Sequence, residues 1–224
     1  MRDRTWVGRA AIWVLALMPA GMIVVDFLRG RLGANPIEEV LHRLGWWALA
    51  ILLVSLALTP LRRATGWNRI IRYRRLIGLF AFAYATAHFL AYIVLDQWFA
   101  WGYIVEDIAK RPFILAGFSA WLLLLPLAVT STTGWIRRLG RRWGRLHRLV
   151  YAAATLGTLH FFWRVKADTR EPIVFVLFLA LLLVLRFPPV SRKLAAWRNR
   201  RTDKRNGGHR NARRSDDRIP APGS

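Results

Sequence analysis

The chain has 224 residues, of which 55% are hydrophobic, yet its formal net charge is +23 at pH 7. Such a composition argues against a soluble domain and is typical of a membrane bundle with basic loops. A nucleic-acid-binding protein can be as basic, but it does not gather its apolar residues in six long blocks. The chain has no cysteine, which excludes disulfides, thiolate-ligated iron–sulfur clusters, covalent C-x-x-C-H haem attachment and cysteine nucleophiles.

The six apolar blocks predict an all-α integral membrane protein, a bundle of six transmembrane helices. Each block has about the length that spans a bilayer, some of them only when interfacial residues are counted. The first block has no convincing small-residue cleavage site after it, so we interpret it as a retained helix rather than a signal peptide. The predicted helices cover residues 10–28, 44–61, 76–95, 113–129, 147–163 and 173–187.

The distribution of lysine and arginine predicts the topology. With a cytoplasmic N-terminus, the segments on the inner side hold 27 of the 35 basic residues, which favours an N-in, C-in arrangement. Residues 1–9 then form a cytoplasmic N-terminus, and residues 10–187 form the transmembrane domain. Residues 188–224 form a basic tail that we expect to be disordered and to lie near anionic lipid. No internal repeat is evident, and no residues remain for a nucleotide-binding domain.

Three histidines fall in apolar surroundings, where an imidazole without a partner is costly. On the predicted topology, the third and fifth helices run in the same direction and place His88 and His160 at nearly the same depth. Two such imidazoles can ligate one haem iron from opposite sides, as in b-type cytochromes. The alternative is a pair of interfacial histidines bonded to backbone or lipid headgroups. The aromatic residues beside them line a pocket, pack between helices or face lipid: Phe89, Tyr92, Phe161 and Phe162.

His147 precedes His160 by 13 residues, about 20 Å along a helix, and has no matching histidine on the third helix. It could ligate a second, inner haem with a weak sixth ligand, hydrogen-bond a flavin or quinone, or be an ordinary interfacial residue. His42 is interpreted as an interfacial or capping residue. Arg74 and Arg75 could pair with haem propionates or a flavin phosphate, or could simply anchor the inner side of the membrane.

The sequence resembles one family in ordered blocks between about residues 33 and 187. The sharpest are RRLIGL followed by His88, and RLHRLVY followed by His160; NPIEEVLHRLGWWAL, KRPFILAGFSAW and LAVTSTTGW also match. They resemble the MsrQ (YedZ) family, within the ferric-reductase-like transmembrane group that includes the NADPH oxidase membrane domains. The resemblance implies that His88, His147 and His160 are associated with haem b and that FMN also binds. Those oxidases hold two histidines on each of two helices, whereas here only the predicted fifth helix has both.

The resemblance also implies the function. The chain would be an electron-transfer subunit in the bacterial inner membrane, not itself the site of methionine sulfoxide reduction. Electrons would come from the quinol pool or a cytosolic flavin reductase and would reach MsrP, a periplasmic molybdopterin-containing subunit. One alternative is a stand-alone ferric reductase or quinol-oxidising cytochrome b. A non-redox transporter is a further alternative, although the apolar blocks lack the acidic residues at mid-depth that transporters often use.

Overall fold

The computed structural model describes residues 5–165, 168–187, 189–190 and 196, so most of the predicted basic tail lies outside the described residues. The described ranges contain helices and turns but no strand. A 3-10 helix, Asn68–Tyr73, precedes α3, and a π-helical turn, Tyr92–Asp96, extends it. The α-helices are α1 Thr5–Leu28, α2 Pro36–Thr65, α3 Arg74–Ala91, α4 Trp101–Lys110, α5 Pro112–Val129, α6 Thr133–Leu139, α7 Arg141–Leu146, α8 Leu149–Arg164 and α9 Arg170–Arg186.

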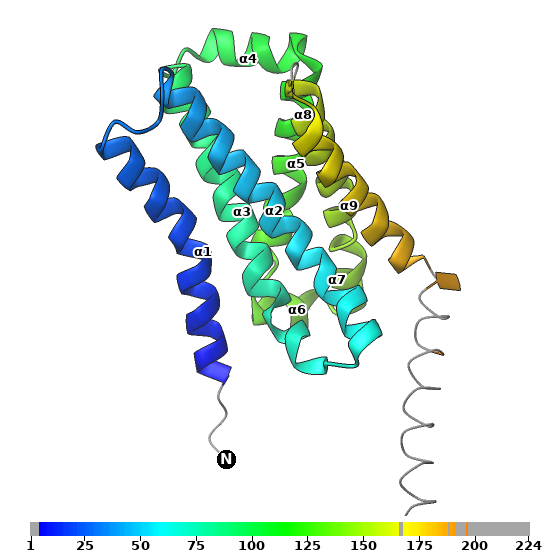
Figure 1. Cartoon of the computed structure of the whole chain (residues 1–224). Coiled ribbons are helices and arrows are strands. Elements are labelled where there is room, and N and C mark those ends of the chain that lie inside the picture. The colour runs from blue at the N-terminus through cyan, green and yellow to red at the C-terminus, as the bar shows by residue number, and fades with distance from the viewer. Residues whose placement is uncertain (1–4, 166–167, 188, 191–195, 197–224) are drawn as a thin grey trace, which may run out of the picture.

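Two tightly packed helix pairs, α2 with α3 and α5 with α8, form the centre of the bundle (Figure 1). Helix α9 packs on α2 and α8, and α1 lies on the other side of the bundle against α2 and α3. The short helix α4 crosses one end of the bundle, whereas α6 and α7 lie at the other. We call these the α4 end and the α6 end.

The bounds of α2 follow from its capping residues. Asn35 accepts a hydrogen bond from the backbone N–H of Glu38 at 3.3 Å, and Pro36 occupies the first helical position, where no N–H is needed. Gly66 ends the helix in the left-handed conformation, with φ of +76°. Helix α2 therefore begins before the predicted block at 44–61 and includes His42. In contrast, α8 begins later than the predicted block at 147–163, so His147 lies before this helix.

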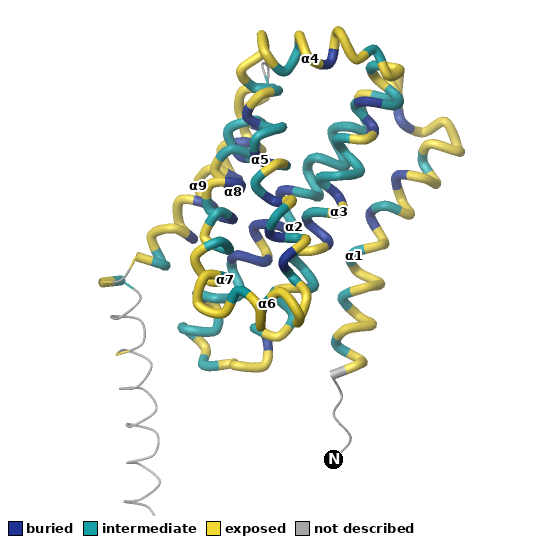
Figure 2. The backbone as a smooth tube through the Cα atoms, turned by 180° about the vertical axis from the view of Figure 1, so that it is seen from behind, coloured by how far each residue is buried: buried dark blue, intermediate teal, exposed yellow. Residues whose placement is uncertain are grey.

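The core is built from leucines and small residues. Ala81, Ala153 and Ala154 are almost fully buried, and such small side chains allow neighbouring helix backbones to approach closely. By contrast, α1 and much of α9 present exposed apolar side chains (Figure 2), as expected for helices that face lipid. The chain is thus an all-helical membrane protein, which confirms the predicted class.

Four of the helices are long and apolar enough to cross a membrane: α1, α2, α3 with its flanking turns, and α5. Helices α8 and α9 have 16 and 17 residues and fall just short of that length. The count of six spans and the N-in, C-in orientation therefore stay predictions.

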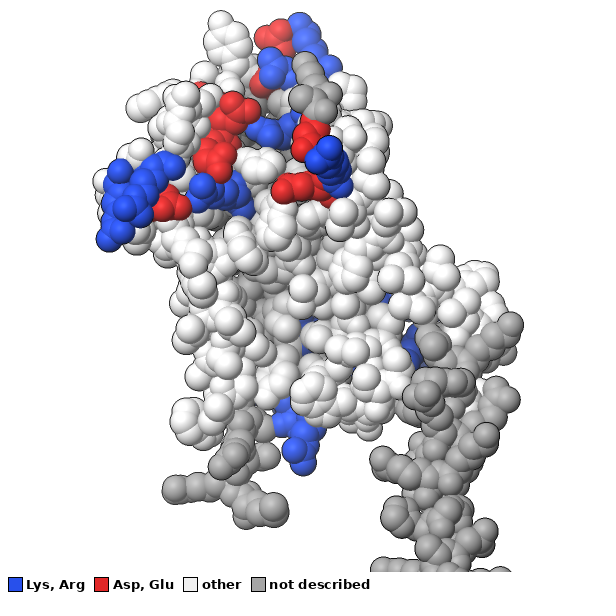
Figure 3. Space-filling view, in the orientation of Figure 1, with Lys and Arg blue, Asp and Glu red and all other residues white. Residues whose placement is uncertain are grey.

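Acidic and basic side chains are separated along the bundle axis. All eight acidic residues in the described part of the chain lie in segments at the α4 end, mixed with arginines and one lysine, as one face shows in Figure 3. The described segments at the α6 end contain fourteen arginines and no acidic residue. The two ends of the molecule therefore present very different charges to whatever lies beside them.

Candidate functional site

His88 is positioned by the pairing of α3 with α2. Its Nδ1 lies 2.9 Å from the backbone oxygen of Leu41. A carbonyl oxygen can only accept, so Nδ1 is the protonated nitrogen, and Nε2 has a free lone pair. The ring also lies against Gly45, one turn further along α2, where a Cβ would be 3.2 Å from two ring atoms. The partner helix thus fixes both the tautomer and the position of this imidazole.

His160 is positioned in the same way by the pairing of α8 with α5. Its Nδ1 lies 2.6 Å from the backbone oxygen of Phe113, which again leaves Nε2 with a free lone pair. Its ring lies against Gly117, where a Cβ would be 2.7 Å from Nδ1 and 2.9 Å from Cε1. Only glycine leaves room for this ring orientation.

The two arrangements repeat each other along the chain. In each pair the histidine follows its carbonyl partner by 47 residues, and the carbonyl precedes the glycine by one helical turn. Corresponding residues of the two pairs are 72 positions apart in the chain. Two short sequence matches accompany this relationship: TAHF resembles TLHF at a shift of 72 residues, and RYRRLI resembles RLHRLV at a shift of 73 residues. The expectation that the chain has no internal repeat is therefore wrong. The repeat is too diverged for its sequence to stand out without the contacts.

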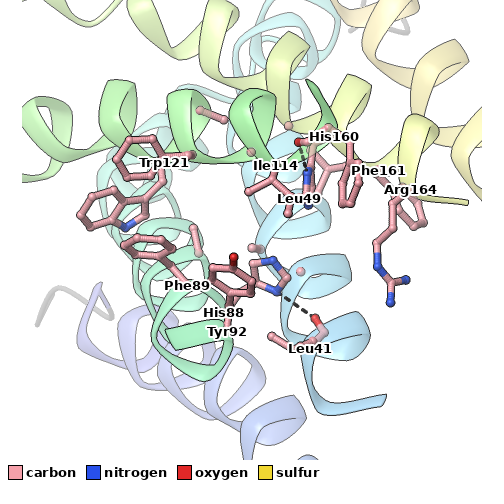
Figure 4. Close-up of a pocket in the computed structure, with 18 of the residues that line it drawn as sticks. Leu41, Leu49, His88, Phe89, Tyr92, Ile114, Trp121, His160, Phe161 and Arg164 are labelled. Atoms are coloured by element: carbon pink, nitrogen blue, oxygen red, sulfur yellow. Dashed lines mark hydrogen bonds between the residues drawn. The ribbon is translucent and has the colours of Figure 1, made fainter. Parts of the chain in front are cut away.

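The two imidazoles face one cavity. Their ring centroids are 6.1 Å apart and their planes are inclined by 74°. The cavity, of about 350 Å³, lies between α2, α3, α5 and α8, and Figure 4 shows the two rings entering it from opposite helix pairs. Most of its walls are apolar: Leu49, Leu52, Ala85, Phe89, Ile114, Phe118, Trp121, Leu124 and Phe161.

This geometry fits a metal held between two Nε2 atoms. Bonds from imidazole nitrogen to a metal are about 2 Å long, so two rings on opposite sides of one metal have centroids about 6 Å apart. The carbonyl bonds at Nδ1 are the partners that orient metal-ligating histidines in proteins. The cavity between the apolar walls leaves space for a flat, largely apolar group around such a metal. The residues present therefore fit a haem with two histidine ligands.

The mouth of the cavity is polar and contains residues that the sequence did not single out. Arg164, in the last turn of α8, lies 3.1 Å from the carboxylate of Glu38 and 3.4 Å from Nδ1 of His42. His42, for which the sequence predicts a capping or interfacial role, lies at this mouth. Of the aromatic residues named beside the histidines, Phe89, Tyr92 and Phe161 line the cavity.

The fourth of those aromatic residues, Phe162, is 38% exposed and does not contribute to the cavity lining. It directly follows Phe161, so the helical rotation between neighbours turns its ring away from the cavity. The packing of α8, rather than closeness to His160 in sequence, decides which aromatic ring reaches the site.

His147 lies apart from the other two histidines, at the α6 end between α7 and α8. Its Nδ1 is 3.2 Å from the backbone oxygen of Trp143, and its ring stacks on that indole with centroids 3.8 Å apart. Its Nε2 is buried and has no hydrogen-bond partner. Arg74 lies close enough to interact with it electrostatically. His147 thus stacks on Trp143 and interacts electrostatically with Arg74, whereas the two cavity histidines lie opposite each other.

The chain is similar to known proteins over most of its length. The family described as ferric reductase like transmembrane component matches residues 44–158. A protein-methionine-sulfoxide reductase heme-binding subunit MsrQ from Rhodospirillum rubrum is 52% identical over 194 residues, which is 86% of this chain and 93% of that protein. MsrQ from Xanthomonas axonopodis pv. citri is 55% identical over 165 residues, 74% of each chain.

The chain belongs to the MsrQ family. MsrQ of Xanthomonas campestris pv. campestris is also similar, 57% identical over 152 residues. No solved structure matches this chain. Membership in the MsrQ family confirms the resemblance inferred from the sequence blocks. The ferric-reductase match begins within α2, three residues after Leu41, and ends within α8, two residues before His160.

Proposed function

We propose that this MsrQ-family chain is a haem-binding electron-transfer subunit of a protein-methionine-sulfoxide reductase. The observation that supports it most strongly is the pair of imidazoles, His88 and His160, whose Nε2 atoms are available and whose rings are 6.1 Å apart across an apolar cavity. A haem bound between them supplies a one-electron redox centre within the membrane.

The residues of the chain bind this haem, orient its ligands and exclude water from it. His88 and His160 hold the iron, and the carbonyls of Leu41 and Phe113 keep both Nε2 lone pairs available as ligands. The aromatic and aliphatic walls exclude water, which protects the site from solvent and influences the reduction potential. Arg164 at the mouth adds a positive charge close to the bound group, next to the carboxylate of Glu38.

The further assignments follow from the charge distribution and the family. We propose six membrane spans, with the arginine-rich α6 end cytoplasmic and the α4 end in the bacterial periplasm. The chain would accept electrons from the quinol pool or a cytosolic flavin reductase and deliver them to periplasmic, molybdopterin-containing MsrP. FMN would bind as a second cofactor. His147, with its buried Nε2, would serve a second haem at the α6 end.

A dithionite-reduced minus oxidised visible spectrum of the detergent-purified protein, with haem quantified per chain, tests the central claim. We expect sharp, low-spin b-type bands from one or two haems per chain. A featureless spectrum from folded protein expressed with ample haem would refute the proposal. Mixing the reduced protein, without oxygen, with a catalytic amount of purified MsrP and with methionine sulfoxide then tests the acceptor, because complete reoxidation should require both.

A further inference from the structure

Arg164 lies one helical turn beyond His160 on α8. Because four residues separate them, the two side chains share a face of that helix. Arg164 lines the same cavity and is close enough to interact electrostatically with both His88 and His160. Figure 4 shows it beside Phe161, at the edge of the labelled side chains. The cation is therefore part of the site that the two imidazoles enter.

Arg164 is the better shielded of the arginines at this cavity. Of the arginines that the structure describes, Arg111 and Arg164 line it, whereas Arg74 and Arg75 do not. The Arg111 side chain is 58% exposed and pairs with Asp107 at 3.1 Å. The Arg164 side chain is only 29% exposed. Because water screens exposed charges more strongly, Arg164 offers an anion in the cavity the stronger attraction.

Arg164 and His42 together present hydrogen-bond donors at the mouth. The Nη1 atom of Arg164 lies 3.4 Å from Nδ1 of His42, and Nη2 lies 3.1 Å from a Glu38 carboxylate oxygen. A guanidinium can only donate, so Nδ1 of His42 accepts and its Nε2 holds the proton. The guanidinium has five N–H groups, more than these two contacts use. Both side chains can therefore donate to a further acceptor.

These residues lie where two cavities adjoin. A second cavity, of about 440 Å³, is lined by Asn35, Glu38, His42 and Arg164, which also line the first. Most walls of the first cavity are apolar, so its polar groups are concentrated at the mouth. Burying an apolar surface is favourable, whereas burying a charge without a partner is costly. The arrangement thus suits a ligand with an apolar body and a carboxylate at one edge.

We propose that Arg164 and His42 bind a propionate carboxylate of the haem, so that its propionate edge faces the α4 end. This inference rests on the proposed haem site between His88 and His160. Arginine donates paired, charge-assisted hydrogen bonds to a carboxylate, and the Nε2–H of His42 adds a further donor. The carboxylate of Glu38 competes for the same guanidinium. Arg164 and His42 thereby fix which way round the haem enters the cavity.

The test compares haem b with its dimethyl ester, which has the same ring and iron but no carboxylate. Each is titrated into the full chain, purified in detergent from haem-starved cells, and the low-spin bands measure binding. We expect haem to bind at least about tenfold more tightly than the ester. Equal affinities would overturn this inference alone. If neither produced low-spin bands, the haem site itself would be refuted, and this inference with it.

Arg164 and Arg170 provide a matched pair of variants. Both lie at the α4 end, but the Arg170 side chain is 93% exposed and does not line the cavity. We expect Arg164→Gln to weaken haem binding about tenfold and to abolish the preference over the ester. Arg170→Gln should leave both affinities unchanged. Equal weakening of haem by the two variants would show attraction to general charge and would overturn the proposal.

A purely structural role of Arg164 gives a different result. Arg164→Gln would then weaken haem and ester alike, which would also overturn the proposal. Glu38→Gln breaks the same ion pair but keeps the guanidinium and removes the competing carboxylate. This variant should therefore retain the preference for haem over the ester. If Arg164→Gln does not fold, the wild-type and Glu38→Gln titrations still decide the question, because loss of the preference in either contradicts the proposed contact.

Discussion

The imidazole rings of His88 and His160 lie 6.1 Å apart although the two residues are 72 positions apart in the chain. Each ring is set by a carbonyl and a glycine of a different helix, and the two helix pairs repeat one another. The distance is therefore a property of how two pairs pack together. A change in either pair should affect both rings.

Replacing either ring should abolish the same haem. We expect His88→Ala and His160→Ala each to remove the low-spin bands of one haem, because both ligands are needed for a six-coordinate iron. Reduced minus oxidised spectra with haem quantification measure the loss. His147→Ala is the comparison variant and should leave those bands in place. Loss of two different haems from the two cavity variants would contradict the shared site.

The loss of haem in glycine-to-alanine variants should depend on how close the new Cβ comes to a histidine ring. Gly117→Ala should reduce haem content most, since its Cβ would lie 2.7 Å from His160 Nδ1. Gly45→Ala should have a milder effect, because its Cβ would lie 3.2 Å from the His88 ring. Gly78, on α3, has nothing within 4 Å, so Gly78→Ala should bind haem normally and stabilise the helix by roughly 0.5–1 kcal/mol. Haem per purified chain measures the series, and equal losses in all three would contradict the packing.

The positive and negative charges at the mouth of the cavity should shift the haem reduction potential in opposite directions. Arg164→Gln removes a positive charge and should lower the haem potential, whereas Glu38→Gln removes a negative charge and should raise it, each by roughly tens of millivolts. Both variants break the same 3.1 Å ion pair, so a merely structural effect would shift both the same way. Spectroelectrochemical titration of the two proteins distinguishes these outcomes.

The attachment of α1 should depend on one hydroxyl. The side chain of Tyr84 on α3 donates to the Ala16 oxygen at 2.6 Å and accepts from the Ala20 N–H at 3.0 Å. Both bonds lie next to Pro19, which has no N–H to donate within the helix. Tyr84→Phe should destabilise the protein by about 1 kcal/mol and speed hydrogen exchange at the Ala20 amide. Unchanged exchange at Ala20 would contradict this.

Tyr103→Phe is the control for that experiment. The Tyr103 side chain is 69% exposed on α4, so loss of its hydroxyl should change neither the stability nor the exchange of α1. A similar effect in both variants would point to a general loss of packing rather than to the bonds at Ala16 and Ala20.

Much of the fold follows from the sequence because apolar length and charge act locally. A run of apolar residues must be helical in lipid, since only a helix satisfies its own backbone there. The caps Asn35 and Gly66 set the ends of α2 beyond its apolar block, and a hydropathy pattern does not show this. His147 was predicted to begin the fifth helix, but the structure places it just before α8, where it stacks on Trp143.

The sequence by itself determined the class of protein, the three candidate histidines and the family, because these depend on composition, spacing and ordered blocks. Tertiary structure alone decided that His88 and His160 share a cavity, that Gly45 and Gly117 make room for them, and that the chain repeats itself. It also placed His42 at the mouth of that cavity. The physical reason is that these relationships are contacts between helices. They join residues 43 or more positions apart, and no local property of either residue specifies its partner.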